Sequence, residues 1–294
     1  MNKNKDQVLK KHNAELKIQV AEKVRQLKIE TALERVRVVA MRMKQPDNML
    51  RICKTISQQL KKLGVKEIRN IQTAIFYEHR GTYMNYQYYA KHNKTFITDT
   101  IYTDHKVALD FAAQMLKGKG KFYITHIRGK KVKDWIAYQK KTNVFIDKYL
   151  YTASSLNYYW YSLGPVALGI STYFPLTEEE ENLFKRFLTV FELAYRRYLD
   201  IEQAEAQARE AKIEAALERI RARALAMHNS EELIDVAKVL REQMGLLGQP
   251  ELETSAVHLY EEDTENILSW RAFRLGTDTK SKISYGHIDR KSVV

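Results

Sequence analysis

Tyrosines in the middle of the chain are the residues whose type and spacing most readily suggest a binding site. Of 18 Tyr, 14 lie between residues 77 and 173. Each combines a flat apolar ring with a hydroxyl that can hydrogen-bond. One interpretation is an aromatic pocket for a small planar ligand, bounded by Tyr86, Tyr88, Tyr102, Tyr158 and Trp160. The other is a sheet that uses these rings as core packing between helices on both of its faces.

Lys and Arg residues between positions 117 and 141 form the second candidate site. The predicted basic surface consists of Lys117, Lys119, Lys121, Arg128, Lys130, Lys131 and Lys133, with Lys140 and Lys141 further along. One acid, Asp134, interrupts the run, and aromatic residues alternate with it. Cations that follow phosphates and rings that stack on bases are typical of nucleic-acid surfaces. An anionic small ligand, or simply a solvated face, would explain the same composition.

Motifs for catalysis or metal binding are absent from the sequence. The eight His are mostly isolated, without the spacing of a zinc site, and the single cysteine, Cys53, lies among apolar helical neighbours. Asp104 precedes His105 at an expected strand–helix junction, where we interpret Asp104 as a helix N-cap and not as a catalytic base. Phosphate-binding loops and dinucleotide fingerprints are missing. We therefore expect no enzymatic activity, and the sequence identifies no cofactor.

Charge is unevenly distributed along the 294 residues. The net charge is +13, and residues 1–44 carry 12 Lys and Arg against 5 acids, whereas residues 177–294 carry 17 against 23. A basic front and an acidic tail favour binding to nucleic acid or to another copy of the chain. One cysteine excludes an internal disulfide, and no segment has the ~20 apolar residues of a membrane span. We expect a cytoplasmic protein.

An internal repeat organises the chain. Residues 29–67 and 213–251 align without a gap at an offset of 184 residues, and 14 of the 39 positions are identical. "IETALERVRVVAM" corresponds to "IEAALERIRARAL". The match then weakens, and the second copy ends before it reaches the last three strand-like segments of the first. This pattern predicts one complete unit followed by an incomplete one.

Hydrophobic periodicity predicts the elements that would position these residues. Strand-like segments occur at 71–77, 83–90, 94–102, 121–127, 154–163 and 166–174, with helical segments at 105–117 and 130–142. We therefore expect an α+β sandwich around an antiparallel sheet of about six strands. The predicted organisation is an N-terminal helix (1–44), an α+β domain (45–176), a long connecting helix (177–228) and an incomplete second domain (229–294).

The connecting helix has the pattern of a coiled coil. Thr177 and Glu180 form a predicted capping box. Apolar residues then step by four and three in the order Leu183, Phe187, Val190, Ala194, Arg197, Ile201, Ala204, Ala208, Ala211 and Ala215, with Arg197 the one charged member. Such a heptad seam predicts pairing with another helix. We expect a homodimer that forms through residues 177–228.

The order of these elements, with "LTEEEENLFKRFLTVFELAYRRYLDIEQAEAQAREA" and "AQAREAKIEAALERIRARALAMHNSEEL" as connecting phrases, resembles the GAF-like sensory modules of bacterial two-component signalling proteins. The resemblance covers residues ~25–294 and includes the tandem arrangement. It implies a non-catalytic input module that passes a ligand or packing signal through a helix to an output domain. It does not specify a ligand, because such domains bind varied small molecules or none. The alternative is a nucleic-acid-binding protein that uses the basic surface at 117–141.

Overall fold

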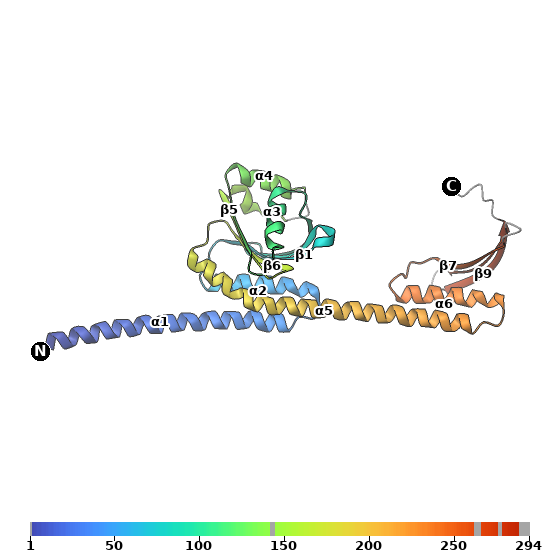
Figure 1. The fold of residues 1–294 in the computed structure, drawn as a ribbon, viewed down its shortest axis with the longest axis horizontal. Helices are drawn as coiled ribbons and strands as arrows, with labels where there is room; N and C mark the ends of the chain where they lie inside the picture. The colour runs from blue at the N-terminus through green and yellow to red at the C-terminus, as the bar shows by residue number, and fades with distance from the viewer. Residues whose placement is uncertain (1, 142–144, 262–265, 276–277, 288–294) are drawn as a thin grey trace. The chain divides into compact units, whose positions relative to one another are not determined.

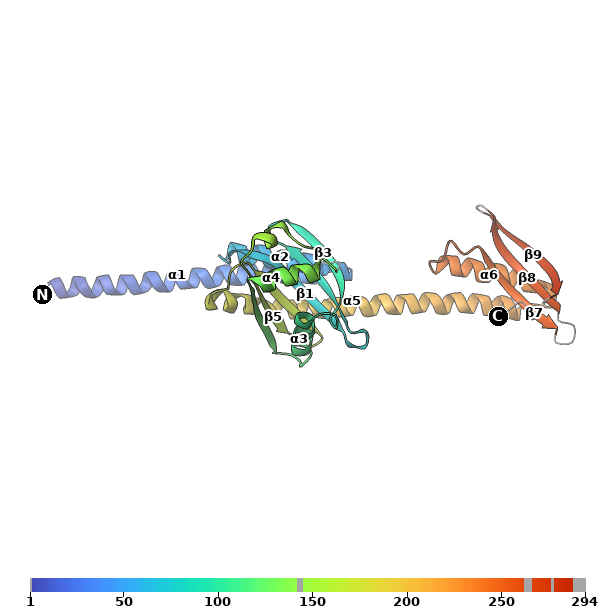
Figure 2. The ribbon, with the colours of Figure 1, turned by 90° about the horizontal axis from the view of Figure 1, so that it is seen from above.

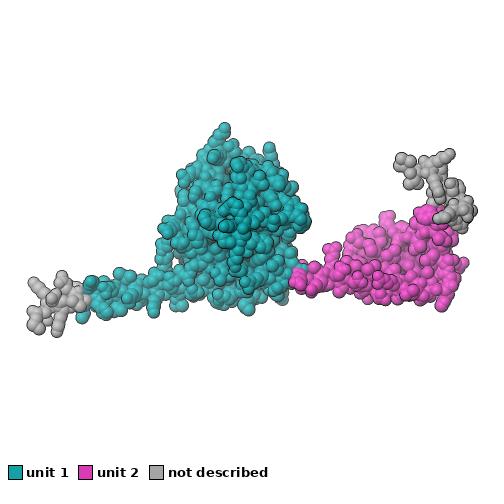
Figure 3. Space-filling view, viewed as in Figure 1, with its two compact units in different colours: residues 1–202 teal, residues 203–294 magenta. Residues whose placement is uncertain are grey.

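The computed structural model describes residues 2–141, 145–261, 266–275 and 278–287. It divides into two compact units, Met1–Glu202 and Gln203–Val294 (Figure 3). The boundary falls inside the long helix, and not at residues 176–177 where the sequence changes from strand to helix.

Unit 1 is an α+β fold around one six-stranded sheet. Its strands are β1 (Ile68–Tyr77), β2 (Thr82–Tyr89), β3 (Lys94–Ile101), β4 (Phe122–Arg128), β5 (Ser155–Ser162) and β6 (Val166–Thr172). The strand order is β3-β2-β1-β6-β5-β4, and every neighbouring pair is antiparallel. All six segments that alternation and β-branched or aromatic content predicted as strands are therefore strands, which confirms the α+β class with an antiparallel sheet.

Helices cover both faces of this sheet, as Figures 1 and 2 show. The bundle face is covered by α1 (Asn2–Met41), α2 (Met49–Lys62) and the first part of α5 (Glu178–Leu225). The opposite face, here called the α3–α4 face, is covered by α3 (Lys106–Met115) and α4 (Lys130–Gln139). Because successive side chains of a strand point to opposite sides, each central strand contributes to both cores.

The bundle face is closely packed with apolar side chains. The stripe predicted on α1 is buried, since Val36 and Ala40 are 0% exposed. α1 and α5 run side by side in the same direction, and they are linked by ion pairs from Arg25 to Glu179 and from Arg186 to Glu30. The apolar core on this side of the sheet is formed by side chains of α1, α2, α5 and the bundle face of the strands.

The heptad seam of α5 requires a correction. Its first half packs into this same core: Leu183, Phe187, Val190, Ala194 and Ile201 are all buried in unit 1. An amphipathic stripe indicates that a helix has an apolar partner, but it does not say whether that partner belongs to the same chain. This half of the seam is not available to a second copy.

Local capping signals are partly as predicted. The Thr177 hydroxyl accepts from the Glu180 backbone N–H at 3.2 Å, and the Glu180 carboxylate accepts from the Thr177 N–H at 2.9 Å, which confirms the capping box. The prediction for Asp104 is wrong. His105 is the N-cap of α3, and its Nδ1 accepts from the Val107 N–H at 3.1 Å. The His105 imidazole therefore accepts the N-cap hydrogen bond that we predicted for the Asp104 carboxylate, one residue earlier.

Unit 2 has the remainder of α5, a helix α6 (Leu233–Leu246) and the strands β7 (Thr254–Glu261), β8 (Asn266–Leu275) and β9 (Asp278–His287). The strands form an antiparallel sheet in the order β7-β8-β9, against which α6 packs. Trp270 of β8 is 1% exposed and anchors this smaller core. Among the described residues of both units, no helix combines the length and apolar character needed to cross a bilayer.

The sequence repeat coincides with repeated local structure. α2 and α6 have bounds that differ by 184 residues at both ends, as do the short turns Pro46–Asn48 and Ser230–Glu232. Arg35 donates to the Gln59 side chain at 3.0 Å, and Arg219 donates to the Gln243 side chain at 2.9 Å. The repeated phrase thus forms a similar helix–turn–helix contact at both positions.

Candidate functional site

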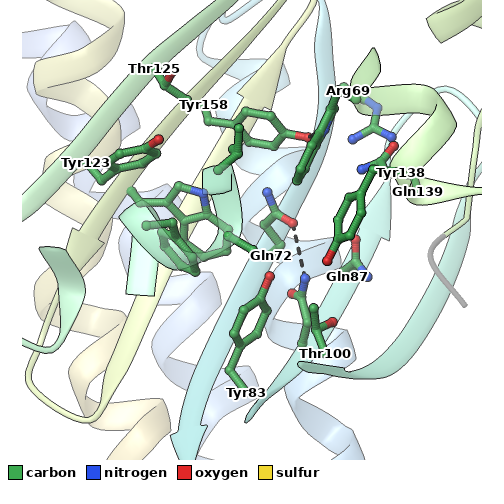
Figure 4. A pocket seen from close by; sticks show the side chains of 16 residues that line it. Arg69, Gln72, Tyr83, Gln87, Thr100, Tyr123, Thr125, Tyr138, Gln139 and Tyr158 are labelled. Atoms are coloured by element: carbon green, nitrogen blue, oxygen red, sulfur yellow. Dashed lines mark hydrogen bonds between the residues drawn. The ribbon is translucent and has the colours of Figure 1, made fainter. Parts of the chain in front are cut away.

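A cavity of ≈ 60 Å³ lies on the α3–α4 face of unit 1, between the sheet and the two helices. Sixteen side chains line it, from β1, β2, β3, β4, β5, α3 and α4 (Figure 4). Five of the seven contributing elements are strands, so a rigid sheet forms the floor. The helices α3 and α4 form the roof.

Seven of the sixteen lining residues are aromatic. Phe111 of α3 lies against Trp160 of β5, with ring centroids 4.4 Å apart, and Trp135 stacks on Tyr138 along α4 at 5.2 Å. The Trp135 Nε1–H donates to the Tyr158 hydroxyl at 2.9 Å, which ties the roof to the floor. Figure 4 shows the Gln72 amide lying among the rings of Tyr83, Tyr138 and Tyr158. These walls suit a flat molecule.

The position of Trp160 depends on a glycine in the neighbouring strand. Trp160 pairs with Gly169 across β5 and β6, and a Cβ at residue 169 would lie 2.5 Å from the indole ring. The indole ring therefore packs directly on the backbone of Gly169, and a side chain at residue 169 would occupy the space of the ring. Gly169 shapes the cavity without lining it.

Polar side chains form the floor of the cavity. Arg69 and Gln72 of β1, and Asn85 and Gln87 of β2, are all buried and all line it. The Gln72 carbonyl oxygen accepts from Asn85 Nδ2 at 3.5 Å. Three further atoms are buried without a hydrogen-bond partner among the described residues: Arg69 Nη2, Gln72 Nε2 and Asn85 Oδ1. Such atoms are uncommon in protein interiors, and each needs an explanation.

Arg69 belongs to a buried ion pair. Its Nε donates to Asp147 Oδ2 at 2.7 Å, and the two side chains are 1% and 0% exposed. The Tyr173 hydroxyl and the Leu150 N–H donate to Asp147 Oδ1 at 2.6 and 3.1 Å. Burial by itself would raise the pKa of Asp147, but the Arg69 guanidinium and these hydrogen bonds hold it below the usual value. Asp147 is therefore ionised at neutral pH.

The tyrosine hydroxyls of the cavity are neutral. Burial raises the pKa of both Tyr83 and Tyr158 above the ordinary value for a phenol. A phenolate at either residue would place an unpaired charge in a low-dielectric interior. These hydroxyls can donate or accept hydrogen bonds at neutral pH, but they offer neither a nucleophile nor a base.

The five predicted pocket residues do not share one site. Tyr158 and Trp160 line the cavity. Tyr102 lies beside it, stacked on Tyr83 at 6.5 Å. Tyr86 and Tyr88 point to the bundle face, where Tyr86 contacts the Tyr198 ring of α5 at 6.1 Å. The alternation predicted within each strand is correct, but a local pattern does not tell which side chains of β2 face the same side of the sheet as Tyr158.

The polar floor is the part of the site that sequence reasoning missed. Gln72, Asn85 and Gln87 are amides at alternate positions of segments that are otherwise apolar or aromatic. Amide side chains at every second position of a strand indicate a polar patch on one face of the sheet, so this part of the site could have been predicted. Arg69 gave no such signal, because an irregularity in the pairing of β1 with β6 between Ile68 and Asn70 changes the local parity.

The predicted basic surface is divided by β4. Lys117, Lys119 and Lys121 precede this strand, whereas Arg128, Lys130, Lys131 and Lys133 follow its start by six residues or more, which is roughly 20 Å along a strand. All seven are exposed. Lys119 Nζ forms an ion pair with Glu192 of α5 at 2.8 Å. The seven cations therefore form two groups and not one continuous patch.

Other candidate residues have structural roles. Cys53 is fully buried, and burial raises the pKa of its thiol to about 12, which leaves it protonated and unreactive. His126 Nδ1 lies 2.7 Å from the Asn157 side-chain oxygen. Within the ranges that the structure describes, no group of three or more His, Cys, Asp or Glu side chains is arranged to hold a metal ion.

Comparison with known proteins does not assign this chain to a family. No model of a protein family matches its sequence, and no curated protein sequence is significantly similar to it. The site must therefore be interpreted from its own geometry.

Proposed function

We propose that this chain is a non-catalytic sensory module of a signalling protein, GAF-like in organisation, which binds a small molecule in the cavity of unit 1. The observation that carries this proposal is the group of three buried polar atoms, on Arg69, Gln72 and Asn85, that have no partner among the described residues and line one cavity. Leaving a buried donor or acceptor unpaired costs about 1–3 kcal/mol. A bound ligand that supplied the missing partners would recover that energy.

Strand β5 supports a route from the cavity to α5. Tyr158 and Trp160 line the cavity, whereas the alternate residues Tyr159 and Tyr161 point to the bundle face. The Tyr159 hydroxyl accepts from the Leu176 N–H at 2.8 Å, just before α5, and the Tyr161 hydroxyl donates to Glu181 Oε1 at 2.7 Å. A ligand that shifts β5 would therefore shift the start of α5. The ligand can shift the equilibrium between two positions of α5 only by the difference in its affinity for the protein in those two states.

Self-association belongs to the same proposal, but through a different helix from the one the heptads predicted. In the first part of α1, residues 9 and 11–28 are exposed, and Leu9, Leu16, Val20 and Leu27 are spaced by seven, four and seven along one stripe. They are 65%, 43%, 61% and 68% exposed. A lone helix of this length is marginal in water, so a second copy of α1 is the partner that we propose.

The repeat gives the proposal its second part. We infer that residues 213–287 begin another module of the same kind, since α2 and α6 have equivalent bounds and equivalent Arg–Gln contacts. In this arrangement α5 is the last helix of the first module and the first helix of the second. A change at the start of α5 would then be passed from one module to the next.

Ligand binding and its effect on α5 can be measured separately. A library of single-ring compounds, screened by thermal shift, should contain members that raise Tm by about 2 °C or more, as expected for a stabilisation near 1 kcal/mol. Hydrogen–deuterium exchange of residues 176–190 should then slow when such a compound is present. Binding without a change in α5 would contradict the relay, and a library without any binder would contradict the cavity as a ligand site.

Self-association has its own test. Light scattering at increasing concentration should approach twice the chain mass of 34.5 kDa. A variant with Leu16→Glu and Leu27→Glu should remain monomeric without loss of secondary structure, because both side chains are exposed in unit 1. A monomer at all concentrations for the unmodified chain would contradict this part of the proposal.

A further inference from the structure

The unpartnered atoms of the cavity specify a pattern of hydrogen bonds. Arg69, Gln72 and Asn85 are 2%, 4% and 6% exposed, so these side chains are removed from bulk solvent. Arg69 Nη2 and Gln72 Nε2 are donors, and Asn85 Oδ1 is an acceptor. A complementary ligand offers acceptors to the first two atoms and a donor to the third. A carboxamide or a lactam, in which a carbonyl lies next to an N–H, offers both along a single edge.

The charge of the site argues against an anion. Among the sixteen described residues that line the cavity, Arg69 is the only one that carries a charge at neutral pH. That charge is already balanced by Asp147 at 2.7 Å. A ligand carboxylate or phosphate would leave the buried group with at least one more negative charge than positive, and the penalty for an uncompensated buried ion is several kcal/mol. The ligand that fits is uncharged.

The volume limits the size of the ligand. The cavity measures ≈ 60 Å³, whereas a cavity that holds benzene measures about 150 Å³. An amide-sized group fits the space as it stands. A ring attached to that group requires an outward shift of the roof, to which α4 contributes Trp135 and Tyr138. Only the amide-like group therefore fits the cavity as it stands, and an attached ring would occupy the space that this shift opens.

We propose that the cavity of unit 1 selects an uncharged, flat, single-ring molecule that presents an amide-like edge to Arg69, Gln72 and Asn85. This inference rests on the proposed sensory function and specifies its ligand class. It also narrows the expectation of a planar or anionic ligand to the planar, neutral one. Aromatic walls provide stacking for the ring, and the polar floor provides the selectivity.

Matched probes test the inference directly. Benzamide and benzoate have nearly the same shape, but benzoate is an anion at pH 7, and toluene lacks the polar group altogether. Isothermal titration calorimetry with the full chain should show benzamide binding at least about tenfold more tightly than benzoate or toluene, the discrimination expected when buried polar atoms recognise a polar group. The neutral lactam 2-pyridone should bind within about threefold of benzamide.

A double variant identifies the atoms responsible. Gln72→Met with Asn85→Leu removes two of the three recognising groups and keeps the volume similar, so benzamide should bind about tenfold more weakly and toluene no more weakly. Lys119→Gln, on the exposed surface, is the control and should leave both affinities unchanged.

The outcomes separate the inference from the function it rests on. If benzoate or toluene binds as tightly as benzamide, or if the double variant binds benzamide normally, the ligand class is wrong although the cavity still binds ligands. If none of the four probes binds at concentrations up to about 20 mM, or up to saturation for toluene, a range that covers even weak fragments of this size, both the ligand class and the proposed sensory function fail.

Discussion

The two faces of the six-stranded sheet have different chemistry although the same strands form both. On the bundle face, Ile71 and Leu168 are 0% exposed and belong to a large apolar core formed with three helices. On the α3–α4 face, the alternate residues include an arginine, two glutamines and an asparagine around a cavity. Apolar packing, together with buried polar groups that have partners, such as Thr73 with the Cys53 thiol at 3.4 Å, explains the first face. The second retains buried polar groups that reduce stability, which is expected of a binding site and not of a core.

Removing the charge of Asp147 is expected to have the largest effect on this comparison. Asp147→Asn leaves Arg69 as an uncompensated buried charge, and the free energy of unfolding should fall by about 3–5 kcal/mol. Urea denaturation followed by circular dichroism measures the change. The double variant Arg69→Met with Asp147→Asn removes both charges and keeps a side-chain oxygen that can accept from Tyr173 and Leu150, so it should lose less stability than Asp147→Asn alone. If both variants lose the same stability, the pair's charge is not the cause.

Acid should remove the same contribution gradually. The folded-state pKa of Asp147 is lowered, so the carboxylate stabilises the fold fully above its unfolded pKa of about 3.9, and this stabilisation is lost as the pH falls through the folded value below that. The difference in unfolding free energy between the unmodified protein and Asp147→Asn should therefore shrink as the pH falls below about 4. Urea titrations between pH 7 and pH 3 provide the measurement. A constant difference across this range would mean that the pKa of Asp147 in the folded protein is not lowered relative to the unfolded chain.

How far the sequence could predict this site depends on what periodicity encodes. Alternation located all six strands and placed Tyr158 and Trp160 together on one face. It could not align one strand with the next, so Tyr86 and Tyr88 were grouped with them although they face the bundle. Pairing between strands depends on long-range contacts that a local pattern does not contain.

Arg69 and Asp147 show a second limit of local patterns. They are separated by 78 residues, and Asp147 lies outside any strand, immediately before a short 3₁₀ turn. Because the pairing of β1 with β6 is irregular near Arg69, strict alternation along β1 does not predict which face its side chain points to. The seam of α5 is a third case, because the heptads correctly predicted a helix partner but not that α1 and α2 of the same chain supply it.

Gly169→Ala tests whether the packing of Trp160 shapes the cavity on the α3–α4 face, and its expected effect on stability is smaller than that of Asp147→Asn. The added methyl would meet the Trp160 ring at 2.5 Å, so the ring must move into the cavity. Overpacking of this kind should cost about 1–3 kcal/mol and abolish ligand binding. Gly245→Ala is the matched control: residue 245 lies inside α6 with open space around its Cβ position, and the change should stabilise by about 0.5–1 kcal/mol. Unchanged near-ultraviolet circular dichroism in Gly169→Ala would argue against a displaced Trp160.

The cavity amides should contribute little to stability, in contrast to their proposed role in binding. Gln72→Met alone removes the hydrogen-bond acceptor that the described residues provide for the Asn85 side chain and should cost about 1–3 kcal/mol, whereas adding Asn85→Leu removes the stranded group as well. The double variant should therefore be within about 1 kcal/mol of the unmodified protein, and more stable than the single variant. A double variant that is less stable than either single change would show that the amides hold the fold together, and the contrast between the two faces would no longer point to a ligand.

The smallest expected effect comes from an ion pair that joins the turn after α3 to α5. Lys119 and Glu192 are 2.8 Å apart, like Arg69 and Asp147, but their side chains are 61% and 27% exposed. Hydrogen bonds from Lys119 and Arg196 lower the pKa of Glu192, yet water screens such a pair, and Lys119→Gln should change stability by less than about 1 kcal/mol and by nothing measurable in high salt. Burial, and not the distance between the charges, would then account for the difference from Asp147→Asn. A loss as large as that of Asp147→Asn would mean that the exposed pair fixes α5 against the sheet, and the proposed route to α5 would have to include this turn as well as β5.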